Sequence, residues 1–138
     1  MTLDEIRTYL LVEFDQVFGP EFGVTLDSAE AGEAVVRLAP ARRHLRPGGI
    51  LSGPTLMALA DAAAYAALLS LDAHAKMAVT TNLSINFLRA APAEGDLLTR
   101  CRTLKNGRRL AVLEAEAVSE GSEEIIAHTV LTYSIPPR

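Results

Sequence analysis

Residues 54–71 read PTLMALADAAAYAALLSL and form the most apolar stretch of the chain, so they determine what kind of fold surrounds them. Pro54 suits the first position of a helix, because its missing N–H would find no helical partner there. The apolar side chains that follow recur on nearly every side of a helix, and a helix of that kind is buried in a core. The stretch therefore predicts a long central helix that neighbouring segments cover.

The segment before this helix predicts one helix and two strands. Residues 3–18 place apolar side chains at helical spacing, Thr2 suits the capping position, and a Gly-Pro pair ends the pattern. Two strand candidates joined by a turn at Ala31-Gly32 follow, at 22–28 and 33–38. Residues 39–53 are rich in Pro, Arg and Gly, which predicts a loop.

The segment after the helix predicts a sheet. Its strand candidates lie at 79–87, 97–105, 110–118 and 125–135. Asn106-Gly107 indicates a tight hairpin, and Glu120-Gly121 indicates another turn. Because tight turns join antiparallel strands, the fold class is α+β, with a mostly antiparallel sheet around the helix in one domain over residues 1–138.

Composition excludes several functional classes. The formal net charge is −4 and the pI is about 5.3, which argues against bulk binding of nucleic acid. Cys101 is the one cysteine, so no internal disulfide forms and a reducing, cytoplasmic compartment is expected. The first residues, MTLDEIRTYL, lack the pattern of a signal peptide. No uninterrupted apolar run reaches the ~18 residues of a membrane span, so no membrane partner is expected.

Asp61 does not fit its surroundings. It is the only charged residue between Arg46 and Asp72, and it stands in the middle of the predicted helix. Burying a lone carboxylate costs several kcal/mol unless the group is paired or changes its protonation. Asp61 is therefore a candidate functional residue, and the alternative is a structural aspartate that a buried hydrogen bond or a narrow exposed stripe satisfies.

The start of the helix provides a second candidate element. Backbone N–H groups at Gly53, after Ser52, favour negative charge such as a developing oxyanion, although plain helix capping explains the same residues. Gly53 and Asp61 are eight positions apart, which is about 12 Å along one helix at ~1.5 Å per residue. Both groups reach one reacting carbon only if two helices lie side by side. The spacing therefore predicts a dimer with shared sites.

Four segments resemble one family of known proteins: RPGGILSGPTLMALADAAAYAALL (46–69), AVTTNLSINFLRAAPAEGDLL (78–98), KNGRRLAVLEAEAVSEG (105–121) and AHTVLTYSIPPR (127–138). The family is the phenylacetate-degradation (PaaI-like) branch of the hotdog-fold thioesterases, and the resemblance spans roughly residues 20–138. It implies an antiparallel sheet wrapped around a long central helix, and a homodimer or homotetramer. It also implies hydrolysis of acyl-coenzyme A thioesters without a metal or other cofactor, coenzyme A being part of the substrate.

The resemblance also implies roles for individual residues. Asp61 matches the acidic catalytic residue, a general base or a nucleophile, and the N–H of Gly53 polarises the thioester carbonyl. Thr80 matches a hydroxyl that orients water, with Thr81 as the alternative if the register differs by one. The chain departs from the family pattern of His-Gly-Gly, which here reads Ser52-Gly53-Pro54, and from an upstream Asn, which here is Arg46. Ser52 and Arg46, with Pro54 beside them, are therefore candidate substrate-binding residues.

The remaining polar residues provide weaker candidates. Arg89, Lys105 and Arg108 lie near strand ends, where they match groups that contact coenzyme A phosphates or are simply solvated charges. The three histidines do not have metal-ligand spacing, and no serine-esterase motif or phosphate-binding loop is present. Two functions compete with the thioesterase: a non-catalytic acyl-coenzyme A binder and a hotdog enoyl-coenzyme A hydratase. The hydratase needs a histidine near Asp61, and the sequence has none there.

Overall fold

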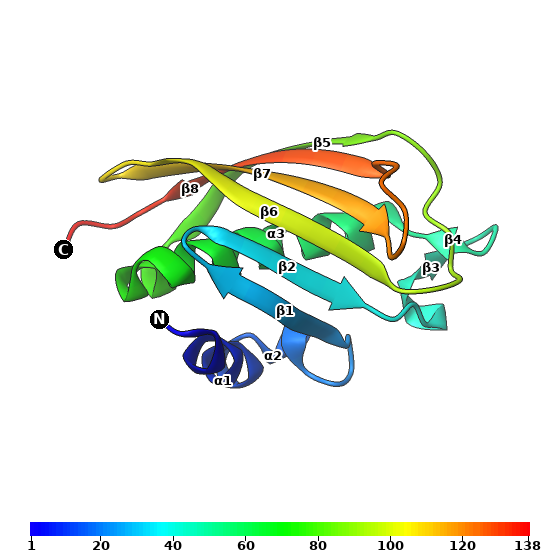
Figure 1. Cartoon of the computed structure of the whole chain (residues 1–138), viewed down its shortest axis with the longest axis horizontal. Helices are drawn as coiled ribbons and strands as arrows, with labels where there is room; N and C mark the ends of the chain where they lie inside the picture. Colours follow the sequence, from blue (N-terminus) through cyan, green and yellow to red (C-terminus); the bar gives the residue numbers. More distant parts are fainter.

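The long helix α3 (Gly53–Leu71) lies against one face of a six-stranded sheet in the computed structural model, which describes all 138 residues (Figure 1). Eleven of its 19 residues are buried, seven of them alanine or leucine in the run from 59 to 67. Small alanine side chains let the helix approach the sheet closely, since protein interiors are densely filled. The buried central helix that residues 54–71 predict is confirmed, and it begins one residue earlier, with Pro54 in the second position.

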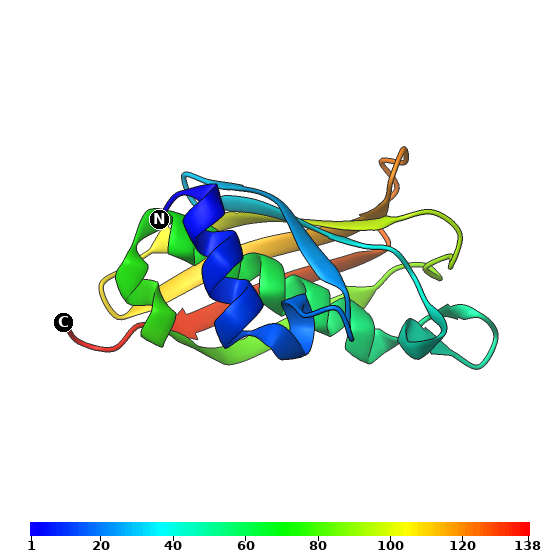
Figure 2. The same cartoon turned by 90° about the horizontal axis from the view of Figure 1, so that it is seen from below.

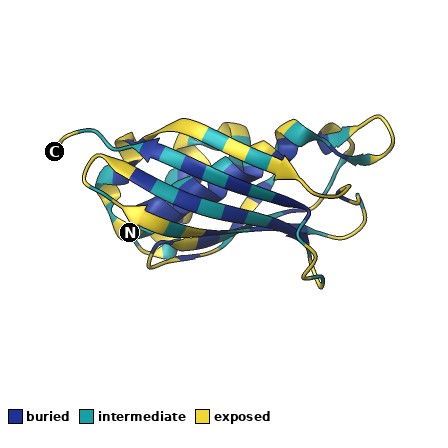
Figure 3. Cartoon of the chain, turned by 90° about the horizontal axis from the view of Figure 1, so that it is seen from above, coloured by how far each residue is buried: buried dark blue, intermediate teal, exposed yellow.

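The sheet is antiparallel throughout, which confirms the α+β class that the sequence pattern predicts and the hotdog architecture that the resemblance implies. Its spatial order is β1-β2-β6-β7-β8-β5. The strand bounds are Val24–Glu30 (β1), Glu33–Leu38 (β2), Val79–Phe87 (β5), Leu97–Asn106 (β6), Leu110–Ser119 (β7) and Ala127–Ser134 (β8). β5 therefore forms one edge of the sheet, and seven of its nine residues are exposed (Figure 3).

The N-terminal segment forms two helices where the sequence predicts one. α1 (Leu3–Glu13) and the short α2 (Asp15–Phe18) are separated at Phe14, whose backbone leaves the helical region. Thr2 caps α1 as expected, because its hydroxyl accepts the N–H of Glu5 and the carboxylate of Glu5 accepts the N–H of Thr2. α1 crosses the C-terminal half of α3 (Figure 2), so it covers a part of the central helix that the sheet leaves open.

Short elements replace the loop predicted for residues 39–53. They are η1 (Arg42–His44), β3 (Leu45–Arg46) and β4 (Ile50–Leu51), and η2 (Ala73–Met77) follows α3. Ala31-Gly32 forms the predicted turn, with positive φ at both residues. The predicted hairpin turn at Asn106-Gly107 lies two residues later in the structure. The Gly107 N–H donates to the Leu110 carbonyl at 2.9 Å, so Arg108 and Arg109 form the tip of the hairpin.

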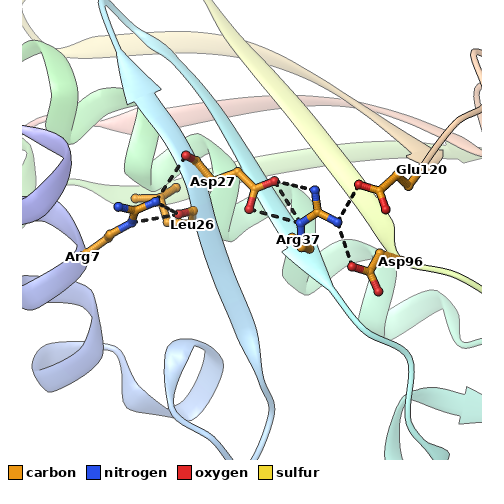
Figure 4. A network of polar contacts seen from close by, with 6 residues as sticks. All are labelled: Arg7, Leu26, Asp27, Arg37, Asp96 and Glu120. Carbon is orange, nitrogen blue, oxygen red and sulfur yellow. Dashed lines mark hydrogen bonds and ion pairs between the residues drawn. The ribbon is translucent and has the colours of Figure 1, made fainter.

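An ion-pair network ties β1 and β2 to the ends of β6 and β7. The Arg37 guanidinium contacts Asp27 at 2.9 Å and both Asp96 and Glu120 at 2.7 Å (Figure 4). These hydrogen bonds, first that to Asp27, hold the pKa of Arg37 above its usual value. Because one guanidinium pairs with three carboxylates, the network joins segments that are distant in sequence.

α3 is long enough and apolar enough to cross a membrane by length and composition alone, although no membrane span is expected from the sequence. Its most apolar window has a mean hydropathy of 1.4, and 61% of that window is buried inside the protein. The central helix of a folded domain has the same composition, so this property agrees with the core position of α3.

His44 fixes the segment that leads into α3. Its side chain has no exposed surface; Nδ1 accepts the Ala41 N–H at 2.9 Å and Nε2 donates to the Phe22 carbonyl at 2.7 Å. The ring also meets Phe22 edge-on, with the ring centroids 4.8 Å apart. Burial, opposed by the bond to Phe22, lowers the pKa of His44, so the neutral ring is the one that fits.

Replacing His44 with leucine leaves the Ala41 N–H without a partner, while the Phe22 carbonyl keeps the Arg43 guanidinium at 3.2 Å. We expect the free energy of unfolding near neutral pH to fall by about 1–3 kcal/mol, the cost of one unpaired buried group. Urea denaturation followed by circular dichroism measures this loss.

The wild type and His44→Leu also test how the free energy of unfolding depends on pH. With the pKa of His44 lowered in the fold, the unfolded chain binds more protons, so stability falls as the pH drops through about 6.5 toward the lowered value. His44→Leu lacks this titrating group. The difference in the free energy of unfolding between the wild type and His44→Leu should therefore narrow at acidic pH. A constant difference from neutral to acidic pH would contradict it.

Candidate functional site

Two hydroxyl groups hold one oxygen of the Asp61 carboxylate. Thr80 donates from Oγ1 to Asp61 Oδ1 at 2.6 Å, and the Tyr133 hydroxyl donates to the same Oδ1 at 2.6 Å. The Tyr133 hydroxyl also lies 3.0 Å from the Asp61 carbonyl oxygen. Oδ2 accepts no hydrogen bond from the protein, so it is the oxygen that remains for a ligand or water.

A β-bulge places the two donors opposite each other. Thr80 pairs with Tyr133 across β5 and β8, and Asn82 pairs with Thr132, so Thr81 is the extra residue. The Thr81 hydroxyl donates to the Thr132 carbonyl at 3.2 Å instead of reaching Asp61. Of the two threonines that the sequence left open, Thr80 is the one in contact with Asp61.

Tyr133 is the site residue that the sequence analysis missed. Its side chain is 2% exposed, and its ring stacks on that of Tyr65 at a centroid distance of 6.5 Å. Burial first, and then the charge of Asp61, raises the pKa of Tyr133 far above its usual value, so its hydroxyl remains a donor. The sequence signal for Tyr133 was its place among the inward-facing residues of β8, with Thr129 and Leu131. A buried tyrosine hydroxyl usually has a hydrogen-bond partner.

Asp61 lies in the wall of a cavity of about 290 Å³. α3, β5, β8 and the N-terminal segment all contribute to its lining, which consists of Tyr9, Glu13, Phe14, Asp61, Tyr65, Ala78, Val79, Thr80 and Tyr133. Four of these side chains are aromatic. A mostly apolar cavity with two carboxylates in its wall, Glu13 and Asp61, can bind an apolar group and present a base to it.

Gly53 lies in a different cavity, at the N-terminal end of α3. This cavity measures about 460 Å³, and Arg46, Phe87 and Arg89 are among its lining residues. A β-carbon on Gly53 would meet Phe87 Cζ at 3.3 Å, so glycine permits the close approach of the strand end to the helix. One chain thus keeps Gly53 and Asp61 about 12 Å apart, at ~1.5 Å per helical residue.

Ser52 and Pro54 belong to the cap of α3. The Ser52 hydroxyl accepts the Thr55 N–H at 3.3 Å and donates to Thr55 Oγ1 at 2.9 Å, so both its functions are engaged. Pro54 is exposed in the first turn. Arg46 is exposed beside them, and its Nε donates to the Pro47 carbonyl at 3.0 Å.

The basic candidates separate into two groups. Arg89 lies with Arg46 at the Gly53 end, where its guanidinium contacts the Ile125 carbonyl and approaches Glu124 at 3.7 Å. Lys105 and Arg108 are exposed at the hairpin between β6 and β7, at the opposite end of the sheet (Figure 1). One chain therefore does not gather the three residues around a single ligand.

α3 has one open stripe beside the free edge of the sheet. Gly53, Met57, Asp61 and Tyr65 follow one another at intervals of four residues, so they share a helix face, and none of them is fully buried. Exposed apolar side chains border this stripe on the edge strand and its flanks: Met77, Val79, Phe87 and Leu88. The face that carries Asp61 is thus apolar and uncovered.

Two other reactive side chains, His128 and Cys101, are paired or buried. His128 lies 2.9 Å from Glu114, which also binds Arg102. Cys101 is buried, and burial raises the pKa of its thiol to about 12. No group of three His, Cys, Asp or Glu side chains has an arrangement that could hold a metal ion.

Comparison with known proteins shows which family the chain matches. The model of the thioesterase superfamily matches residues 48–126. No curated protein matches the chain. A crystal structure named as a candidate thioesterase, from Silicibacter sp. TM1040, is 42% identical, with 99% of this chain and 93% of that one covered and a TM-score of 0.85.

Two further solved structures share the fold. A variant of the phenylacetic acid degradation protein PaaI from Thermus thermophilus is 27% identical over 90% of this chain and 99% of that one, with a TM-score of 0.76. A hypothetical thioesterase from Streptococcus pneumoniae, solved with coenzyme A, is 20% identical over 83% of this chain and 90% of that one, with a TM-score of 0.74.

Proposed function

Since the chain belongs to the thioesterase superfamily and is a thioester hydrolase, we propose that its substrate is an acyl-coenzyme A and that Asp61 is its central catalytic residue. The observation that carries the proposal is the Asp61 carboxylate, with Oδ1 held by two hydroxyl donors and Oδ2 unpaired at the wall of an apolar cavity. The coenzyme A bound to the Streptococcus pneumoniae relative supports this substrate class.

In the general-base form of the mechanism, Asp61 Oδ2 takes a proton from water as the water oxygen attacks the thioester carbon. The Gly53 N–H stabilises the resulting oxyanion, as backbone donors do at such sites. Collapse breaks the carbon–sulfur bond, and the coenzyme A thiolate recovers the proton from Asp61. In the nucleophilic form, Oδ2 attacks the carbonyl directly and displaces the coenzyme A thiolate; water then hydrolyses the mixed anhydride and supplies the proton that the thiolate takes up. Thr80 and Tyr133 hold Oδ1 in both forms.

A homodimer completes this site. Within one chain Gly53 cannot reach a carbonyl beside Asp61, but two antiparallel copies of α3 bring each Gly53 beside the partner's carboxylate. The unpaired β5 edge and the apolar stripe of α3 support this arrangement, because an exposed strand edge and an apolar face are surfaces that a second copy can cover. Association into a tetramer remains a prediction.

The two cavities then orient the substrate. The partner's Gly53 cavity brings Arg46 and Arg89, whose guanidinium groups suit the phosphates of coenzyme A, to one side of the thioester. The Asp61 cavity takes the acyl group on the other side. Ser52 and Pro54 shape the rim near the carbonyl, and Lys105 and Arg108 provide further positive charge for the nucleotide at the far hairpin.

The direct test measures free coenzyme A with a thiol-reactive dye across short, medium, long and aryl acyl-coenzyme A substrates. We expect release from at least one class by the metal-free protein in a chelating buffer, since the proposal needs no cofactor. Absence of release from every substrate, with binding still detected by calorimetry, would favour the non-catalytic binder. Hydration of an enoyl-coenzyme A, followed by loss of its conjugated absorbance, would favour the hydratase.

A cross-linking prediction tests the dimer. Residue 57 is midway between 53 and 61, so a two-fold axis that pairs Gly53 with Asp61 in both directions passes beside Met57. Mild oxidation of Met57→Cys, or a short bis-maleimide, should join two chains on a non-reducing gel, because facing cysteines lie within bonding reach. Leu71→Cys is the matched control: both side chains are 40% exposed on the same helix, and only residue 57 lies at the axis.

Buried Cys101 is present in both variants and is out of reach of the reagent, so it does not confuse the result. Equal cross-linking of the two variants, or none in Met57→Cys at concentrations where light scattering shows a dimer, would contradict the proposed pairing of the helices. The cytoplasm is the proposed compartment, because a lone reduced thiol and a coenzyme A thioester both suit it.

A further inference from the structure

The N-terminal helix forms part of the cavity that contains Asp61. α1 contributes Tyr9 and Glu13 to the lining, and Phe14, at its end, adds a third side chain. This helix lies outside residues 48–126, which match the superfamily model. Part of the wall of the Asp61 cavity therefore comes from a segment that the matched region does not include.

α1 is a fixed wall. Ile6 and Leu10 have no exposed surface and anchor the helix in the core. The Arg7 side chain donates to the Leu26 carbonyl from Nε at 3.0 Å and from Nη2 at 2.8 Å, which ties the helix to β1 (Figure 4). With the Thr2–Glu5 capping box at its start, both the position and the rotation of α1 are set.

A pair of tyrosines joins this wall to α3. The Tyr65 hydroxyl donates to the Lys76 carbonyl at 2.8 Å, so the 3.0 Å contact between the two hydroxyl groups has Tyr9 as the donor. The Lys76 ammonium lies over the Tyr9 ring, 4.8 Å from its centroid, and Phe14 meets the Tyr65 ring edge-on at 6.1 Å. These contacts fix the aromatic side chains that line the cavity on the α1 side.

We propose that α1 sets the length of the acyl group, with the Tyr9 ring closing the cavity one acyl group away from Asp61. The inference rests on the proposed function, because it takes the Asp61 cavity as the acyl site. At about 290 Å³ the cavity is at the lower edge of the range for small-molecule pockets, so it takes a compact acyl group and rejects longer chains.

The test compares acyl-coenzyme A substrates and S-alkyl-coenzyme A thioethers of increasing chain length on three variants. Tyr9→Ala removes the ring and should move the length limit upward, while Tyr9→Trp should move it downward. Val12→Ala, on the solvent face of the same helix, should leave the limit unchanged. Melting temperatures establish that the variants are folded.

Two ratios are measured. The first divides kcat/KM for an acyl chain just longer than the limit by kcat/KM for an acyl chain that fits. The second makes the same comparison for the affinities of the two thioethers. A difference of one methylene changes such ratios about 10–200-fold in a shaped pocket, so Tyr9→Ala should raise the ratio roughly tenfold or more. A loss of stability alone lowers both members of the ratio together and leaves it unchanged.

The thioethers keep this inference separate from the proposed function. Suppose that no substrate releases coenzyme A but the thioether length limit moves in opposite directions in the two Tyr9 variants. The proposed reaction is then wrong, and the inference that α1 sets the acyl length is supported. If release occurs and neither variant moves the limit, the reaction stands and the inference is overturned. Absence of any length limit, or of thioether binding, also overturns it.

Discussion

Replacing Asp61 with asparagine is expected to lower kcat by about 10²–10⁴-fold, the usual contribution of a general base, while KM changes little. Asparagine keeps an oxygen that can accept the hydrogen bonds from Thr80 and Tyr133, so the fold around the site is retained. It has no second oxygen that can take a proton or attack the carbonyl. Steady-state release of coenzyme A, with circular dichroism as a check of folding, measures the effect.

Asp15→Asn, an exposed aspartate at the start of α2, controls for the loss of one carboxylate and should have wild-type kcat. Turnover by Asp61→Asn within a factor of about three of wild type would remove Asp61 from the mechanism, since that lies well below the effect of a base. A single turnover in ¹⁸O-labelled water tests the nucleophilic form, because label appears in the Asp61 carboxyl group only if water attacks the Asp61 side of a mixed anhydride.

Mixing two inactive proteins is expected to restore activity if the sites are shared. Asp61→Asn lacks the carboxylate, and Gly53→Val blocks the approach of the carbonyl to its N–H, which typically costs about 10²–10³-fold at an oxyanion donor. In a mixed dimer the intact Gly53 of one chain meets the intact Asp61 of the other. Equal mixing gives about one quarter of wild-type turnover, since half of the dimers are mixed and each has one complete site.

Differently tagged chains show whether exchange has occurred, and co-purification of both tags sets the fraction of mixed dimers. A mixture of Asp61→Asn with a chain that has both substitutions is the control, because none of its mixed dimers contains a complete site. Proven exchange without recovery would place Gly53 and Asp61 in separate functions and would return the oxyanion contact to groups near Asp61 in the same chain.

The catalytic candidate was visible in the sequence because its signal is local. Asp61 interrupts an apolar helix, and the free energy of burying a charge makes such an interruption rare unless a partner or a function accounts for it. Its partner Tyr133 is 72 residues away and looks like an ordinary alternating strand residue. Only the pairing of β5 with β8 brings its hydroxyl under the helix.

The choice between Thr80 and Thr81 depended on a single bulge. Adjacent strand residues point to opposite faces, so a shift of one residue exchanges the threonine that reaches Asp61 with the one that does not. Neither threonine differs from the other in composition or neighbours in a way that reveals the bulge. The register of Thr80 with Tyr133 is seen only in the pairing of β5 with β8.

Local sequence was enough to predict the central helix, the antiparallel strands and their order along the chain, and to mark Gly53 and Asp61 as candidate site residues. These follow from periodicity and from the cost of unpaired charge, both of which act over a few residues. Three features arise only in the folded chain: Tyr133 and Thr80 share one carboxylate oxygen, Lys105 and Arg108 lie far from Arg89, and α1 lines the Asp61 cavity. They depend on contacts between segments distant in the chain, which local patterns do not encode because many pairings satisfy the same alternation.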